Sequence, residues 1–272
     1  MNKKMVFRTV GRLAQIVALL LLIPAAVAII YGEEKQFFAF AITAAFAFLA
    51  GVIISLLTKT KNRVIYAKDG FAITALAWIV MALIGAVPFV ISGDIPSYVD
   101  AVFETVSGFT TTGASILTDV EAMSYSGLFW RSFTHWIGGM GVLVFVMAVI
   151  PNFTDRSIHI MRAEMPGPII GKLVPRVKDT AKILYLIYIV LTLVQIILLL
   201  AGGMSLFDSI VHSLGTAGTG GFAIKSDGLA SYSPYCQWVI TIFMLIFGVN
   251  FNLYYLILMK KVSTAINIVI TH

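Results

Sequence analysis

The sequence of 272 residues has few charged side chains and a single cysteine. Charged residues make up 12% of the chain and hydrophobic residues 59%, whereas a soluble domain carries about 25% charged residues. This composition excludes a soluble globular domain. One cysteine can form neither an intrachain disulfide nor a cysteine-based metal cluster. We therefore interpret Cys236 as a small residue packed near the start of a helix.

Motifs of common enzyme classes are also missing. The sequence has no His-Glu-x-x-His, no paired intramembrane aspartates, no Ser/His pair at usable spacing and no Walker-type phosphate loop. The net charge of +6 would suit nucleic acid, but the basic residues lie in loops between apolar runs rather than on one face. We predict neither an enzyme nor a nucleic-acid-binding protein, and we expect no cofactor.

What is present is a series of apolar runs long enough to cross a bilayer, which takes about 20 residues in a helix. The first run has a basic flank like that of a signal peptide, but it is too long for a typical signal-peptide core and further runs follow it. We therefore interpret it as a retained helix. The predicted spans are 13–31, 37–57, 71–91, 130–150, 183–201 and 238–259.

A short segment follows the third span. About ten residues within 98–109 would form a helix of roughly 15 Å, half of the ~30 Å hydrocarbon core, so the helix could enter a membrane without crossing it. The run Thr-Thr-Thr-Gly-Ala at 110–114 does not favour a helix, and irregular backbone at membrane depth needs protein around it or a watery path beside it. A half-helix ending in such a run is typical of a cation filter built from backbone carbonyl groups.

The same pattern occurs a second time, after a shift of 108 residues that takes Thr111 to Thr219 without a gap. The shift also aligns Gly113 with Gly221, and the register continues to Trp130 and Trp238 in the following spans. Chance would seldom align a Thr-x-Gly turn and a downstream tryptophan in one register. The sequence therefore predicts a second half-helix at 207–214 and a second filter at 215–223.

We predict that the two filters bind a cation. The candidate site residues are Thr111, Thr112, Gly113, Thr219, Gly220 and Gly221. The expected ligands are the backbone carbonyl groups of Thr111, Thr112, Thr219 and Gly220. The alternative is that the small residues only allow helices to approach closely. That alternative suits Gly138, Gly139 and Gly141 better than it suits two short helices at equal spacing.

Four ionisable residues occupy matching positions in the half-helices. Asp100 and Asp208 begin them, and an N-cap role is at least as well supported as direct contact with a cation. Glu104 and His212 lie at membrane depth, where an ionisable group indicates function by default. We interpret both as hydrogen-bonding residues that support the filter.

Three further polar residues lie in the spans that follow the filters. His135 has aromatic neighbours and no carboxylate or second histidine at metal-ligand spacing, so we interpret it as a packed side chain. Asn250 and Asn252 interrupt the last span. Exposure to a cavity below the filter and hydrogen bonding between helices explain them equally well.

Basic residues predict the orientation of the chain. With the N-terminus in the cytoplasm, the inner segments contain 16 of the 19 Lys and Arg residues, including six in the loop at 152–182. Lys35, Arg131 and Lys225 alone fall outside. Because basic residues favour the cytoplasmic side, we reject the opposite orientation.

Several motifs resemble a known family. SGFTTTGA at 107–114, GTAGTGGF at 215–222, and WRS followed by HWIGGMG at 130–132 and 135–141 resemble the Trk/Ktr/HKT superfamily of potassium transporters, Trk-type uptake proteins in particular. The resemblance implies an all-α, potassium-channel-like integral membrane fold. Its expected parts are a two-helix extension (1–62), two repeats of helix, re-entrant pore loop and helix (63–151 and 183–261), a cytoplasmic basic loop (152–182) and a tail (262–272).

The resemblance also implies a function. It implies potassium uptake across a prokaryotic plasma or inner membrane, a homodimer of the full-length protein and a cytosolic nucleotide-binding regulatory subunit. Attraction to anionic lipids explains the basic loop equally well. The family has four repeats and this chain has two, so we expect an N-terminal half. The alternatives are a secondary solute transporter with broken helices and a non-conducting truncated scaffold.

Overall fold

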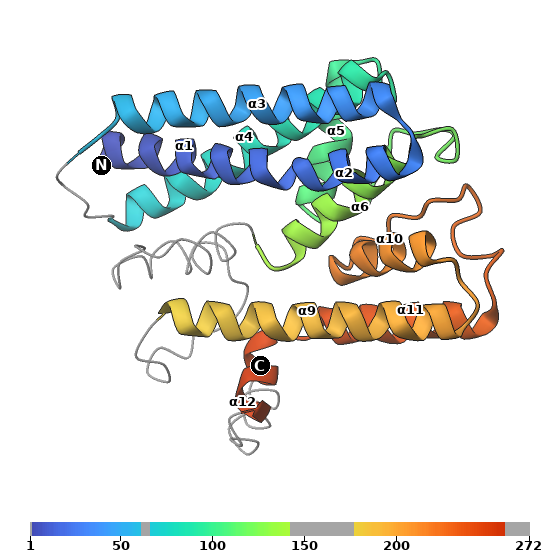
Figure 1. Cartoon of the computed structure of the whole chain (residues 1–272). Helices are drawn as coiled ribbons and strands as arrows, with labels where there is room; N and C mark the ends of the chain where they lie inside the picture. The colour runs from blue at the N-terminus through green and yellow to red at the C-terminus, as the bar shows by residue number, and fades with distance from the viewer. Residues whose placement is uncertain (1, 61–65, 142–176, 259–272) are drawn as a thin grey trace.

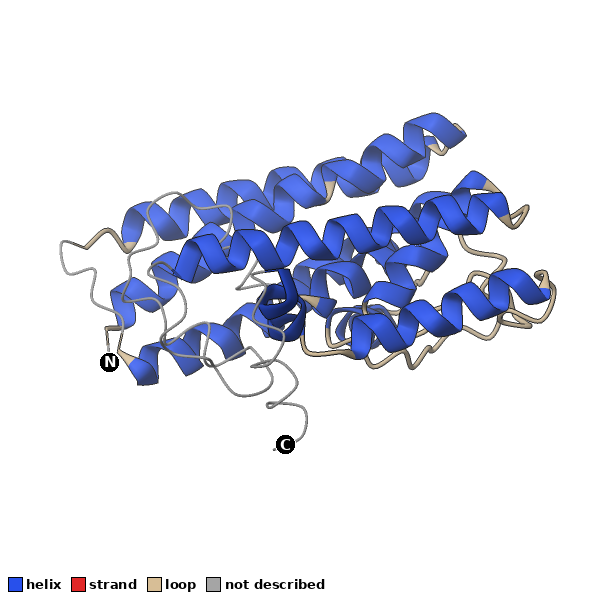
Figure 2. Ribbon diagram, turned by 90° about the horizontal axis from the view of Figure 1, so that it is seen from below, coloured by secondary structure: helices blue, strands red, loops and turns tan. Residues whose placement is uncertain are grey.

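The computed structural model describes residues 2–60, 66–141 and 177–258. The regular elements in these three ranges are all α-helices, and most of the long ones run roughly side by side (Figures 1 and 2). This confirms the predicted all-α fold for the described part of the chain. The predicted basic loop at 152–182 lies outside the described residues up to residue 176, and the predicted tail at 262–272 lies wholly outside them.

The first membrane span is longer than predicted. It consists of α1 (Lys3–Leu20) and α2 (Leu22–Tyr31), which together form a candidate span of 29 residues. The helix begins ten residues earlier than hydropathy suggested because Asn2 caps it, with its side chain accepting the Met5 N–H. The backbone N–H of Asn2 donates in turn to Asp69 Oδ1 at 2.8 Å. Local capping therefore extends the helix through a basic segment.

The second span, α3 (Glu34–Leu57), packs along α1 through two glycines. A Cβ atom on Gly51 would lie 2.5 Å from the carbonyl oxygen of Gly11, and one on Gly11 would lie 3.0 Å from the carbonyl oxygen of Gly51. Inside a bilayer the hydrophobic effect does not drive helices together. Small residues instead allow two helix backbones to pack closely. The two backbones are in contact here.

We expect Gly51→Val to destabilise the protein, because the added side chain would push α1 and α3 apart. Overpacking of this kind costs about 1–3 kcal/mol. Thermal unfolding of the detergent-solubilised protein measures the effect. Ala50→Val is the matched control, since Ala50 is the preceding residue of the same helix and is exposed. Equal unfolding temperatures for the two variants would contradict the prediction.

The first half-helix enters the bundle from one face, and the chain then returns to the same face. The third span, α4 (Ala67–Ser92), is followed by the half-helix α5 (Tyr98–Phe109) and then by α6 (Tyr125–Gly139). Between the last two, Ser124 Oγ donates to Asp94 Oδ2 at 2.7 Å. The residues that precede α5 and those that precede α6 therefore lie at the same face of the bundle, so the segment between them is re-entrant.

The second repeat has the same path. The span α9 (Val177–Ala201) is followed by the half-helix α10 (Leu206–Ala217) and by α11 (Pro234–Gly248), which runs alongside α9 (Figure 1). Ser233 Oγ donates to the carbonyl oxygen of Gly202 at 3.4 Å, which again joins the start of the exit helix to the end of the entry helix. Cys236 is buried in the first turn of α11, as predicted.

The two half-helices match each other residue by residue. Each has 12 residues, and their first residues are 108 positions apart. The N-cap prediction for Asp100 and Asp208 is wrong, because the serines three residues earlier are the caps. Ser97 and Ser205 accept the backbone N–H of Asp100 and Asp208 at 3.4 and 3.1 Å. The aspartates lie in the first turn, where their charge complements the helix dipole.

The end of the second half-helix also differs from the prediction. The predicted filter began at Gly215, but α10 continues to Ala217, so residues 215–217 are helical. The first repeat predicts this outcome, because the matching residues 107–109 end α5. Gly215 fits against the second filter, where a Cβ atom would lie 3.0 Å from the carbonyl oxygen of Phe222.

The exit helices are shorter than the predicted spans. Among the described residues, four helical segments are long and apolar enough to cross a membrane, and neither exit helix is one of them. The predicted single span 238–259 is wrong. The chain breaks between α11 and α12 (Phe251–Leu258), where Val249 is extended with φ −72° and ψ 139°. The predicted span 130–150 is described only to residue 141, and its helix ends at Gly139.

Candidate functional site

The predicted filters have the same unusual backbone. Thr111 and Thr219 have φ of 56° and 57°, and no other non-glycine residue in the described ranges has a positive φ. Gly113 and Gly221, two residues further on, have φ of 77° and 75°. A left-handed conformation costs a β-branched residue roughly 1–2 kcal/mol. Strain that recurs at one position of two repeats is typical of a functional site.

The two filters contact each other. A Cβ atom on Gly113 would collide with the carbonyl oxygen of Gly220, and one on Gly220 would collide with Nε2 of His135. Glycine is therefore required by space at both positions, and also by φ at Gly113. The structure thus brings together filter segments that lie far apart in the sequence.

All six predicted site residues are at least partly exposed, although the half-helix ends beside them are buried. Thr112, Thr219 and Gly221 are exposed, and the other three are half-buried. The side chain of Thr112 does not extend freely, because its Oγ1 lies 2.8 Å from Thr110 Oγ1. The accessible surface at the site is therefore backbone and hydroxyl, with no charged group among the six residues.

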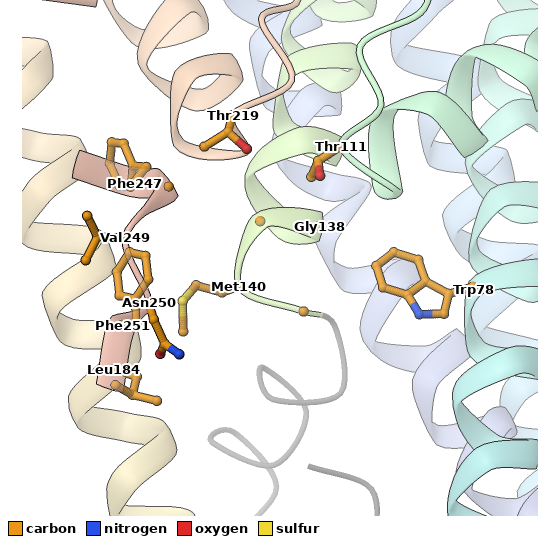
Figure 3. A pocket seen from close by; sticks show the side chains of 13 residues that line it. Trp78, Thr111, Gly138, Met140, Leu184, Thr219, Phe247, Val249, Asn250 and Phe251 are labelled. Carbon is orange, nitrogen blue, oxygen red and sulfur yellow. The ribbon is translucent and has the colours of Figure 1, made fainter. Parts of the chain in front are cut away.

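The filters lie between two hollows. A cavity of about 330 Å³ on one side is lined by Thr111 and Thr219 together with residues of α6, α9, α11 and α12. Figure 3 shows Thr111 and Thr219 at one end of this cavity and Asn250 further away. A hollow of about 250 Å³ on the other side is lined by Gly113 and Gly221. A small ion passing between the hollows would meet the filter backbone.

Asn250 lines the larger cavity, so the cavity-facing interpretation holds for this residue, while the side chain of Asn252 is not described.

Gly138 and Gly139 serve close packing, as predicted. A Cβ atom on Gly138 would collide with the carbonyl oxygen of Phe109, and one on Gly139 would lie 2.9 Å from that of Ala217. The two glycines therefore hold α6 against the ends of both half-helices.

Glu104 supports the first filter. Its side chain is buried and accepts hydrogen bonds from Ser115 Oγ at 3.0 Å and from the Ile116 N–H at 2.9 Å. Both donors follow the filter directly. The hydrogen bonds predicted for this residue are therefore present, and the carboxylate is also paired with a positive charge, because Arg131 Nε donates to its Oε1 at 2.5 Å.

Arg131 was not predicted as part of the site. Its side chain is 3% exposed, and its Nη1 donates to the carbonyl oxygen of Ala223 at 2.8 Å. The guanidinium carbon lies 3.5 Å from the centre of the Phe222 ring. The sequence contained a signal for it, since a charge at membrane depth needs a partner and Glu104 lies in the same repeat.

The second repeat has no equivalent pair in the described residues. His212 occupies the place of Glu104, and its ring lies edge-on to Tyr232 at 5.1 Å. Its Nε2 is buried without a hydrogen-bond partner in the described part of the chain, so the hydrogen bond predicted for His212 is not formed at this atom. Val239 occupies the place of Arg131.

His135 is fully buried and its ring lies 3.9 Å from that of Phe222, which confirms the packed interpretation. Among the described residues no group of three or more His, Cys, Asp or Glu could hold a metal ion.

Comparisons with known proteins agree with this architecture. The family described as "TrkH: Cation transport protein" matches residues 36–269. The Trk system potassium uptake protein TrkH of Escherichia coli (strain K12) is 36% identical over 262 residues, which cover 95% of this chain and 54% of the relative. TrkH of Halomonas elongata is 31% identical, with 94% and 53% covered.

A solved structure is also similar. The crystal structure of the potassium transporter TrkH from Vibrio parahaemolyticus superposes with a TM-score of 0.80 at 30% identity, covering 94% of this chain and 52% of that chain. The described helices therefore have the arrangement of a membrane transporter. The chain spans about half the length of the curated relatives it matches.

Proposed function

This chain belongs to the TrkH family of cation transport proteins, and we propose on that basis that the full-length protein takes up potassium ions through the two Thr-Gly filters. Members of the family are transporters, not enzymes. The observation that carries the proposal is the repeated backbone strain at Thr111 and Thr219, placed between two hollows. Strain of this kind persists only where the surrounding structure holds it.

The chemistry of the filters suits a large monovalent cation. The ligands we propose are the carbonyl groups of Thr111, Thr112, Thr219 and Gly220, which would replace part of the hydration shell of the ion. Such ligands favour K⁺ over a strongly hydrated divalent ion. The half-helices α5 and α10 end at the filters, so the partial negative charge of each helix C-terminus adds to the attraction.

We propose that this chain supplies two of four pore repeats, at 63–151 and 183–261, after a two-helix extension at 1–62. The exposure of the filter residues supports this count, because a filter closed by four repeats would cover them. We also propose a cytoplasmic N-terminus, from the distribution of basic residues. A homodimer and a nucleotide-binding subunit on the cytoplasmic face follow from the family resemblance alone.

A secondary transporter is the second candidate, and the helix break between α11 and α12 favours it, since such carriers place substrate sites at broken helices. Against it, the two repeats are direct. Each exit helix begins at the face where its entry helix ends, and the rings of Tyr125 and Phe207, 4.9 Å apart, bring the starts of α6 and α10 to one face. In carriers of that class the halves are usually inverted.

Passive flux distinguishes the candidates. With the full-length protein in liposomes, we expect radioactive rubidium to enter down a K⁺ gradient alone, and external K⁺ to compete more strongly than Na⁺. Liposomes without protein are the control. Uptake that requires an added Na⁺ or H⁺ gradient would favour the carrier, and absence of any cation uptake would remove the proposal.

A further inference from the structure

We propose that Arg131 is a positioning residue that fixes the ends of both filters at once and thereby sets the selectivity of the pore. The inference rests on the proposed function, because it concerns the same site. It begins with the place of Arg131 in α6, the exit helix of the first repeat. From there the side chain reaches the filter of the second repeat.

Two edges of the guanidinium group donate hydrogen bonds to different repeats. Nε donates to Glu104 Oε1 in the first half-helix, and Nη1 donates to the carbonyl oxygen of Ala223. Its face covers the Phe222 ring, with 3.5 Å between the guanidinium carbon and the ring centre. Phe222 and Ala223 directly follow Gly221 of the second filter. One arginine therefore holds the second filter from two sides.

Glu104 completes the connection to the first filter. It accepts from Ser115 Oγ and from the Ile116 N–H. Ser115 and Ala223 are equivalent positions under the shift of 108 residues, each two residues beyond the filter glycine. The ion pair thus connects equivalent positions of the two filters. A displacement of one filter end would therefore also displace the other.

The bridge is asymmetric, which argues against a general packing role. The second repeat has His212 and Val239 at the matching positions, so the first repeat supports both filters of this chain. A buried ion pair contributes little stability over apolar side chains of similar volume, and fixing one arrangement is its better-supported use. Here the fixed arrangement is that of the filter backbone.

Lysine cannot take the place of Arg131. A lysine presents one nitrogen at the end of a flexible stem and no planar face, whereas the guanidinium donates in two fixed directions and stacks on a ring. Arg131→Lys should keep the charge and the pairing with Glu104 but lose the bond to the Ala223 carbonyl. Losing one hydrogen bond to a charged group corresponds to about a tenfold change in an equilibrium.

The test uses the full-length protein in liposomes and measures the ratio of K⁺ to Na⁺ permeability together with total rubidium uptake. For Arg131→Lys we expect retained uptake and a permeability ratio lowered about tenfold. Lys35→Gln is the control, because Lys35 is an exposed basic residue outside the filter region, and it should leave the ratio unchanged. A normal ratio in Arg131→Lys would overturn the proposal.

A second variant covers the case in which Arg131→Lys does not fold. The double change Glu104→Gln with Arg131→Gln removes both buried charges together, and a reduced ratio in this variant supports the positioning role. A wild-type ratio, or loss of both variants from the membrane, would assign the pair to folding alone and overturn the proposal. Lack of K⁺ selectivity in the unaltered protein would instead contradict the proposed function itself.

Discussion

Gly113→Ser should lower K⁺ over Na⁺ selectivity more strongly than Gly221→Ser in the full-length protein. Both glycines have a left-handed backbone, with φ of 77° and 75°, so a side chain at either position costs roughly 1–3 kcal/mol in strain. Their surroundings differ. A Cβ atom on Gly113 would collide with the carbonyl oxygen of Gly220, whereas at Gly221 the nearest atom is Met244 Cε at 3.7 Å.

The collision explains the expected order of the two effects. Serine at position 113 would displace the Gly220 carbonyl, which is one of the proposed ligands, and so would disturb both filters. Serine at position 221 would strain only its own segment. Permeability ratios for K⁺ and Na⁺, measured in liposomes, give the comparison.

Gly203→Ser is a control that distinguishes the effect of backbone strain from the effect of a position in the filter. Gly203 has φ of 85° and no atom within 4 Å of its Cβ position, and it lies between α9 and α10, away from the filters. Its substitution should lower stability by a similar amount without changing the permeability ratio. An unchanged ratio in Gly113→Ser would remove the filter assignment.

The sequence predicted the half-helices well because their signals are local and occur twice. The change from an apolar segment to Thr and Gly marks each end, and the shared register of Thr111 and Thr219 tests one copy against the other. The structure adds the capping serines, Ser97 and Ser205, three residues before the aspartates. Each serine is close in sequence to its aspartate. The sequence alone could therefore have predicted that Asp100 and Asp208 occupy the N3 position of their helices.

The helix break in the last span was harder to predict. Gly248, Val249 and Asn250 lie within an apolar run, and hydropathy does not distinguish a continuous helix from two shorter ones in such a run. Neither valine nor asparagine ends a helix by itself. In the structure, α11 packs on α9 and ends at the larger cavity.

Arg131 was missed because its partners are distant and partly backbone. Charge counting placed it among the few basic residues outside the predicted inner segments, and such a count gives no information on burial. Its contact with Glu104 is within one repeat, but the carbonyl oxygen of Ala223 has no sequence signature. The contact between Gly113 and Gly220 is of the same kind: only the folded chain brings the two backbones together.

Residues 1–272 expressed alone should not support growth of a K⁺-uptake-deficient cell on limiting K⁺. The reason is the number of filters: under the proposed fourfold arrangement, two segments form half of a ring and leave the other side open. Thr112, Thr219 and Gly221 are exposed in this chain. Polar backbone facing lipid costs several kcal/mol per unsatisfied group, so the isolated chain should aggregate, misfold or pair.

Pairing of two copies could complete a ring of four filters, but each copy would also bring α1, α2 and α3, which the second half of a four-repeat protein would lack in the proposed arrangement. We therefore expect no selective pathway from pairing. The experiment expresses residues 1–272 with and without the downstream genomic sequence, and follows growth and rubidium uptake at matched membrane levels. Growth restored only with the downstream sequence would agree with the prediction. Growth from residues 1–272 alone would contradict it and indicate a conducting dimer of this chain.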